Sequence, residues 1–327
     1  MLMRSPLVET VETACDLCGS RDHAPFATGY DHEYTAGPAQ RFDFVKCRQC
    51  GLVYLNPRPA ISEFKKIYPE NYHSYHYVTK KSALSGLASR FGSNTIARDA
   101  YVARSKQGPL RVLDVGCGNG PKLDMFRQLD PSIETHGLES DPKAVAWARS
   151  NGHQVHQGLY EDFDPAGLRF DIIIASHVIE HVASPSAFMA KTRDLLADSG
   201  CFVCETPNID TVELALLRRN GNWGGFHTPR HWNFFDEQTF RALAAKTGLR
   251  VKELTYRPVP AFWIWTFHKM LQDCFGGKLK PLADRLMPVS HHHLYATALA
   301  AGFSMLDLAI KACTGKCSGL RAILTKE

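Results

Sequence analysis

From Pro109 onward, short apolar runs alternate with segments that carry apolar residues at helical spacing. A near-continuous apolar run such as FDIIIAS, Phe170–Ser176, is typical of a strand that is covered on both faces of its sheet. Strands that alternate with helices in this way build parallel βα units, so the pattern predicts an α/β fold. The predicted strands are Arg111–Val115, Thr135–Leu138, a short one around Val155, Phe170–Ser176, Cys201–Thr206, Arg250–Tyr256 and Leu320–Thr325.

Capping residues mark the helices between these strands. Asp141 and Ser184 each stand directly before a proline, which is the order of an N-cap and a first helical residue. We expect the helix after Ser184 to end near Gly200. A later helix begins after Asp236 and stops at Gly248.

The chain before Pro109 has a different pattern and a distinctive set of cysteines. Two CxxCG units, with 28 residues between their inner cysteines, supply four thiols, which is what a closed tetrahedral zinc site requires. Chance pairing of thiols is the alternative. The predicted ligands are Cys15, Cys18, Cys47 and Cys50. We therefore expect a zinc-ribbon domain over 1–58.

A helical, aromatic-rich connector is predicted over 59–108. Its tyrosines Tyr72 and Tyr75 could fold over an active site as a cap, and plain packing is the alternative. The third region, 109–327, contains all the predicted strands of the α/β sheet.

A helical insertion, 257–318, separates the last two predicted strands. From Ala261 to Cys317 it carries six Lys or Arg against three Asp or Glu, with aromatic residues gathered at its start. Two interpretations stay open: a helical hairpin packed on the core or in a homodimer, or a lid or membrane-surface element. Its most apolar run, Leu294–Ile310, contains Asp307 and is shorter than a bilayer span. We expect His291–His293 to form a solvated turn.

The overall composition is that of a soluble globular protein, with 44% hydrophobic and 22% charged residues. A net charge of +5 without a long basic run gives no indication of nucleic-acid binding. The N-terminus lacks the apolar core of a signal peptide, so we expect a cytoplasmic protein, with peripheral contact at the inner membrane surface through 257–318 as an extension of that expectation. Cys201 and Cys204, on one predicted strand, are expected to be core thiols.

The turn after the first predicted strand carries the strongest chemical signal. It reads D-x-G-x-G-x-G, with Asp114 two residues before the first of three glycines, Gly116, Gly118 and Gly120. A dinucleotide turn holds a pyrophosphate, which an adjacent carboxylate would repel. S-adenosylmethionine (SAM) has no phosphate and carries an ammonium and a sulfonium. Glu139, 25 residues beyond Asp114, stands where a carboxylate can accept both ribose hydroxyls.

These segments resemble the class I SAM-dependent methyltransferases. VLDVGCGNG is similar to the cofactor loop of that family, GLESDP to its ribose-binding segment, and FDIIIASHVIEHV to its fourth strand and following helix. The resemblance implies a Rossmann-like seven-stranded sheet whose last strand runs antiparallel between strands five and six. One position departs from the pattern: Leu159 stands where many relatives carry an Asp for adenine. The implied cofactor contacts are Asp114, Gly116, Cys117, Gly118, Gly120, Glu139, Ser140, Leu159, Tyr160 and Ser176.

A narrower resemblance covers nearly the whole chain. The order of CxxCG, CxxCGLVYLNPRP, the methyltransferase core and WGGFHTPRHWNFF is similar to bacterial zinc-ribbon methyltransferases that modify sugars, polysaccharides or secondary metabolites. It implies a small-molecule or sugar-type acceptor, methylated on oxygen, with carbon or nitrogen open. For O-methylation a histidine near neutral pKa can take the hydroxyl proton. The candidates are His177, His227 and His231, whereas His181 is expected to be structural.

Two other functions stay open at this point. One is an RNA methyltransferase that binds its substrate with the ribbon, although the ribbon segment has few basic residues. The other is a non-catalytic, zinc-stabilised interaction protein that keeps the cofactor fold.

Overall fold

The computed structural model describes residues 7–32, 37–69, 100–101, 110–217, 221–274, 278–288 and 294–327. Most of the predicted connector 59–108, with Tyr72 and Tyr75, lies outside the described residues, as does the run His291–His293.

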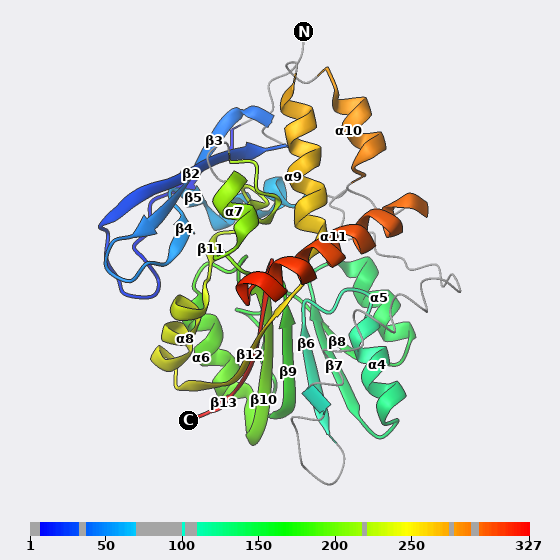
Figure 1. Cartoon of the computed structure of the whole chain (residues 1–327). Coiled ribbons are helices and arrows are strands. Elements are labelled where there is room, and N and C mark those ends of the chain that lie inside the picture. Colours follow the sequence, from blue (N-terminus) through cyan, green and yellow to red (C-terminus); the bar gives the residue numbers. More distant parts are fainter. Residues whose placement is uncertain are drawn as a thin grey trace.

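The centre of the molecule is a seven-stranded sheet with the order β12-β13-β10-β9-β6-β7-β8. Strands β8, β7, β6, β9 and β10 are parallel, and β13 runs antiparallel between β10 and β12, as the resemblance implied. Figure 1 shows the strands side by side with helices on both sides. The bounds are β6 Arg111–Val115, β7 Glu134–Glu139, β8 Gln154–Gln157, β9 Phe170–Ser176, β10 Leu196–Pro207, β12 Leu249–Arg257 and β13 Gly319–Lys326.

Alternate residues of the central strands enter two different cores. On one face Val112, Ile172 and Ile174 pack with helices α4 (Pro121–Leu129) and α5 (Pro142–Ser150). On the other, Leu113 and Ile173 pack with α6 (Pro185–Leu195) and α8 (Glu237–Lys246). Both faces are therefore covered, which explains the continuous apolar runs.

The predicted caps are present. The side chains of Asp141, Ser184 and Asp236 each accept hydrogen bonds from backbone amides at the start of α5, α6 and α8, respectively. The predicted end of α6 near Gly200 is wrong: the helix ends at Leu195, because Leu196 is already extended and pairs with Phe170. The pairing register then shifts between Leu196 and Cys201.

A second, four-stranded sheet has the order β11-β4-β3-β2. Its strands are β2 (His23–Asp31), β3 (Gly37–Cys47), β4 (Val53–Leu55) and β11 (Asn233–Phe234), and β1 (Thr10–Val11) pairs separately with β5 (Arg58–Pro59). Short helices η1 (Ile61–Glu63) and α1 (Phe64–Ile67) follow.

Strand β11 follows β4 only after a long stretch of chain, so the second sheet combines two segments that are far apart in the sequence. Phe44 stacks on Phe226 at 4.3 Å between ring centroids, and Arg230 forms a buried ion pair with Asp31 at 2.9 Å. The ribbon sheet therefore includes a strand from beyond the predicted boundary at residue 58, and residues on both sides of that boundary share one core.

The insertion contains three described helices, α9 (Pro260–Asp273), α10 (Lys280–Leu286) and α11 (Leu294–Thr314), which Figure 1 places over the carboxyl ends of the parallel strands. Before it lie α7 (Val212–Leu217) and the short η4 (Gly224–Phe226). The expectation that the apolar run is too short to span a bilayer is wrong on length, because α11 continues to Thr314 and has 21 residues. Within the described parts of the chain it is the one helix long and apolar enough to cross a membrane.

Candidate active site

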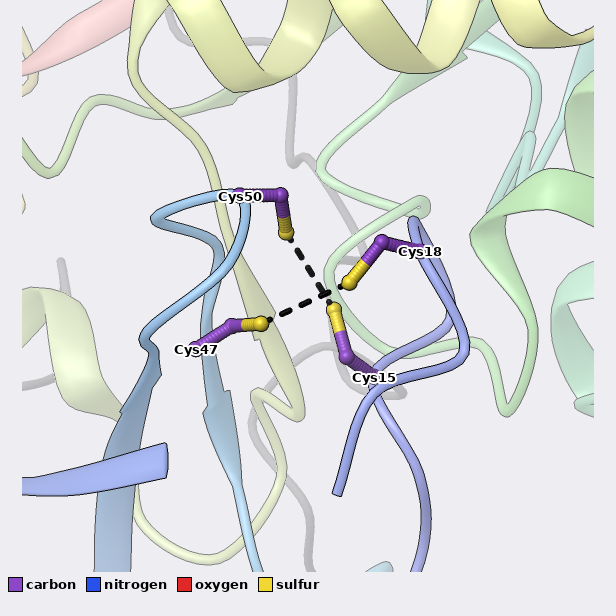
Figure 2. A group of neighbouring side chains, drawn as sticks. All are labelled: Cys15, Cys18, Cys47 and Cys50. Carbon is purple, nitrogen blue, oxygen red and sulfur yellow. Dashed lines mark hydrogen bonds between the residues drawn. The ribbon is translucent and has the colours of Figure 1, made fainter. Parts of the chain in front are cut away.

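Four cysteine thiols from two tight turns of the ribbon point toward a common centre (Figure 2). The Sγ atoms of Cys15 and Cys50 are 3.5 Å apart, as are those of Cys18 and Cys47, and all four lie within 4.8 Å of one another. Four thiolates bound tetrahedrally at the usual Zn–S length are separated by about 3.8 Å. Gly19 and Gly51, with φ of 78° and 83°, close the turns by donating to the carbonyls of Cys15 and Cys47.

The ribbon is attached to the main sheet through its first turn. Asp16 accepts hydrogen bonds from the Ser184 hydroxyl and the Ser186 amide, at 2.6 and 2.7 Å, so it helps to cap α6. Lys246, at the end of α8, donates to the Asp16 carbonyl at 2.8 Å. The cysteine site is therefore joined to the two helices that cover one face of the sheet.

The glycine turn that follows β6 has the geometry that its sequence requires. Gly116, Gly118 and Gly120 have φ of 69°, 54° and 86°, a region that favours glycine. A Cβ built on Gly118 would meet nothing within 4 Å, so the backbone borders open space there. The turn leaves room for a ligand to approach the main chain.

Asp114 lies beneath this turn with a fully buried side chain. Among the described residues, neither carboxylate oxygen of Asp114 has a hydrogen-bond partner, and the Lys122 ammonium stands 3.6 Å away. Burial raises the pKa of Asp114 to about 6, although Lys122 acts in the opposite direction. A buried carboxylate without a donor beside an open turn fits a ligand that brings a cation and N–H donors.

Glu139, at the end of β7, stabilises the same turn by hydrogen bonds. Its carboxylate accepts the Gly118 amide at 2.9 Å and the amides of Ser140 and Asp141 at 2.7 and 3.0 Å. The thiol of Cys117 packs inward against Gly137. Cys117 can therefore line a ligand through its backbone only.

The neighbouring strand ends carry further polar groups. Ser176, the last residue of β9, donates to Glu205 on β10 at 2.6 Å, and Arg321 on β13 donates to the same carboxylate at 2.6 Å. The next residue, His177, has φ of 57°, which is strained for a side-chain-bearing residue. Such strain is commonly found at functional positions.

The ring of His177 is held by a buried carboxylate. Its Nδ1 lies 3.0 Å from Oε1 of Glu180, which is fully buried and accepts the Thr206 hydroxyl at 3.2 Å on its other oxygen. Burial raises the pKa of Glu180, but the hydrogen bond and charge of His177 lower it to about 2. An ionised carboxylate only accepts, so Nδ1–H of His177 donates and Nε2 keeps its lone pair.

Residues 88–254, half of the chain, match the family described as "Methyltransferase domain". The chain belongs to this methyltransferase family. It is similar to the Ubiquinone biosynthesis O-methyltransferase of Cereibacter sphaeroides (strain ATCC 17025), at 28% identity over 245 residues, which cover 71% of this chain and 91% of that protein. The protein of the same name from Ruegeria pomeroyi is 28% identical over 227 residues, 62% of this chain and 82% of the relative.

Among solved structures, the mycolic acid cyclopropane synthase CmaA1 in complex with SAH and CTAB has a TM-score of 0.48 at 16% identity, and the match covers 81% of this chain and 94% of that one. The family match and the relatives above make the protein a SAM-dependent methyltransferase, and its core is the seven-stranded α/β sheet. SAM supplies a methyl group on a sulfonium, and the residues around Asp114 fit its cationic end.

One of the expected adenine contacts, Tyr160, needs correction in this methyltransferase. The Tyr160 hydroxyl is buried and hydrogen-bonded to Thr192 at 2.7 Å, beside Phe188, so it is not directed to a ligand. Leu159 is 38% exposed and offers only an apolar side chain or its backbone.

The expected roles of His227 and His231 need correction as well, because both rings are buried. Nδ1 of His231 bonds to the Gly225 carbonyl at 2.8 Å, and burial lowers the pKa of His231 to about 3. His227 packs between His231 and Trp265. Both rings therefore belong to the aromatic packing between the ribbon and α9.

Glu180, His181 and His231 also place one ligand atom each within 4.8 Å of one another, which could hold a metal ion in the methyltransferase. However, both oxygens of Glu180 already serve His177 and Thr206, and His181 Nδ1 lies 2.7 Å from the Tyr68 hydroxyl. We therefore assign this group to a hydrogen-bond network. Sequence reasoning overlooked Glu180, although its i,i+3 spacing from His177 is a recognisable signal.

Replacing Asp114 should weaken the binding of S-adenosylhomocysteine (SAH). Asp114→Asn keeps the shape but removes the charge, so we expect the affinity at neutral pH to fall roughly 10- to 100-fold in isothermal titration. Because the pKa of Asp114 is raised to about 6, wild-type affinity should also rise as the pH increases through that value, and the variant should lose this rise. Asp198→Asn, a fully exposed carboxylate on β10, is the control. Equal affinities for Asp114→Asn and wild type would contradict the assignment.

Proposed function

We propose that the protein transfers the methyl group of SAM to a hydroxyl of a small-molecule acceptor, with His177 as the general base. The observation that carries this proposal is the His177–Glu180 pair at the carboxyl end of β9. The pair lies beside the cofactor turn, since a Cβ on Gly116 would touch Val178 at 3.1 Å.

The chemistry of His177 follows from its surroundings. Desolvation lowers the pKa of His177, but the hydrogen bond and charge of Glu180 outweigh it, so the net direction is upward. In the neutral ring, Nε2 would accept the proton of an acceptor hydroxyl as that oxygen bonds to the methyl carbon and the carbon–sulfur bond of SAM breaks to leave SAH. Glu180 fixes the tautomer and stabilises the imidazolium that results.

The acceptor we favour is a phenolic hydroxyl. The rings of Phe262 and His177 lie 6.3 Å apart between centroids and at 89° to each other, so an aromatic side chain borders the space next to the base. The relatives named above act in ubiquinone biosynthesis as O-methyltransferases, which supports a hydroxyl on a small molecule. A sugar hydroxyl, the expectation from the narrower sequence resemblance, is the alternative that the product assay separates.

The remaining assignments complete this proposal. Glu139 and Ser140 would hold the ribose of SAM. The backbone of Gly116–Gly118 would contact its methionine part, and Ser176 would lie beside the methyl group. We further infer that the four ribbon cysteines hold one structural zinc ion, because their sulfur separations suit tetrahedral thiolate coordination.

The pH dependence of methyl transfer tests the role of the pair. Because the pKa of His177 is raised, the neutral base of the wild type is lost as the pH falls through a value above the ordinary one. Glu180→Gln removes the carboxylate charge, so the acidic limb of the pH–rate profile should move to lower pH while the plateau rate falls. Single-turnover SAH formation with catechol measures both. Glu161→Gln, on an exposed loop, should keep the wild-type profile, and an unshifted limb in Glu180→Gln would refute the assignment.

A further inference from the structure

The outward side of α11 is mainly apolar and carries no charge over Tyr295–Thr314. Tyr295, Met305, Leu306 and Leu308 expose 39%, 66%, 40% and 52% of their surfaces. Over Tyr295–Thr314, the part of the helix whose exposure is described, no exposed residue is charged. A helix on the surface of a soluble protein normally carries its charged residues on this side, so the face is suited to an apolar partner.

The charged residues of α11 point inward and attach it to the protein. Asp307 is buried and accepts hydrogen bonds from the Trp263 indole at 2.9 Å and the Ser318 hydroxyl at 2.8 Å. Lys311 donates to the Tyr256 carbonyl at 2.8 Å. Crossing a bilayer would break these bonds, so the helix is built to lie along an apolar surface.

Helix α10 continues the same surface and adds positive charge. The Tyr295 hydroxyl donates to the Arg285 carbonyl, which joins the start of α11 to the end of α10. Leu282 and Leu286 are 40% and 47% exposed. Over 278–286 three exposed basic residues stand against one acid, Asp284, which is already paired with Lys280 at 2.9 Å.

A second copy of the chain is a poor occupant of this face. A helix of 21 residues is about 31 Å long and about 10 Å wide, so one face offers about 300 Å². Stable dimers bury about 800 Å² per partner. A bilayer surface has no such minimum area, because a few inserted apolar side chains together with basic residues at the headgroups suffice for binding.

We propose that α10 and α11 form a docking surface for an anionic lipid bilayer, with the apolar face of α11 in the interfacial layer and the basic residues of α10 toward the headgroups. On α9, Trp263 donates a hydrogen bond to Asp307 of α11, and the residue before it, Phe262, packs next to His177. On the basis of the proposed function, docking would place the acceptor site close to the bilayer and favour acceptors that partition into lipid.

Vesicle flotation of the full-length protein tests the proposal. We expect binding to vesicles of phosphatidylcholine with phosphatidylglycerol, and weaker binding to phosphatidylcholine alone. Met305→Glu and Leu308→Glu should each reduce binding to the anionic vesicles about tenfold or more. Leu129→Glu, on α4 with a similar exposure of 45%, should bind as the wild type does.

Two results would overturn the proposal: wild type that stays unbound to anionic vesicles at low salt, or α11 variants that bind as the wild type does. A wild-type dimer in sedimentation velocity that becomes monomeric in Met305→Glu would assign the face to a second copy instead. SAH titration shows that each variant is folded. Methyl transfer to soluble catechol should be unchanged in the α11 variants, and its absence from every protein, wild type included, would refute the proposed function without affecting the vesicle result.

Discussion

His177→Ala should lower the rate of methyl transfer by roughly 10²- to 10⁴-fold, the usual contribution of a positioned general base. The side chain lies on the strand end beside the glycine turn, and its Nδ1–H is held by Glu180 at 3.0 Å. Alanine removes the acceptor for the hydroxyl proton. The substitution should cost little stability, because the His177 side chain is 38% exposed.

The measurement is single-turnover SAH formation at saturating SAM, with SAH affinity measured in parallel. The affinity should stay within a few-fold of wild type, since the cofactor contacts we assign, apart from Ser176, lie at the carboxyl ends of β6 and β7. His156→Ala, an exposed histidine on β8, is the matched control and should keep the wild-type rate. A His177→Ala rate within twofold of wild type would exclude His177 as the base.

Removal of metal from the ribbon should strongly destabilise the whole protein. Structural zinc sites in small domains contribute on the order of 10 kcal/mol at neutral pH. Cys15 and Cys47 are buried in the same core as strands β6 and β9, and Asp16 caps α6. Loss of the metal therefore removes packing from the main sheet as well as from the ribbon.

We expect about one zinc per chain by elemental analysis. Cys47→Ser should bind far less zinc and lower the midpoint of thermal unfolding by more than 10 °C, roughly the effect of losing several kcal/mol in a chain of this size. Cys313→Ser, an exposed cysteine on α11, is the control and should leave both unchanged. A zinc-free wild type with unaltered thermal stability would show that the four thiols have another role.

The parts of the structure that follow from local sequence were predictable. The three glycines need left-handed φ, the capping residues start helices, and buried strands need continuous apolar runs, so each leaves a pattern within ten or so residues. The cysteine cluster was also recognisable, because each half is a complete turn by itself. The sheet order came from the family resemblance.

The parts that depend on distant pairing were not predictable from local patterns. Strand β11 completes the ribbon sheet from residue 233, and Arg230 pairs with Asp31 in the core, although no local signal links those segments. The same long-range packing buries His231, whose sequence context of glycines and aromatics suggested a crevice. Glu180 stands between His177 and His181 in the sequence, and only the folded turn shows that its hydrogen bond is to His177.

The electrostatics of the strand ends connect these features to function. Asp114, Glu139, Glu180 and Glu205 all lie at the carboxyl edge of the sheet. This concentration of carboxylates favours a positively charged methyl donor. The ribbon and the insertion helices lie over the same edge and would limit which acceptors enter (Figure 1).

Product analysis after incubation of the purified protein with SAM and catechol tests the central claim most directly. The account predicts a mono-O-methyl ether, identified by mass spectrometry and by the methyl carbon shift in NMR, formed together with an equal amount of SAH. Methylation of a sugar acceptor or of RNA, with catechol left unchanged under the same conditions, would contradict it.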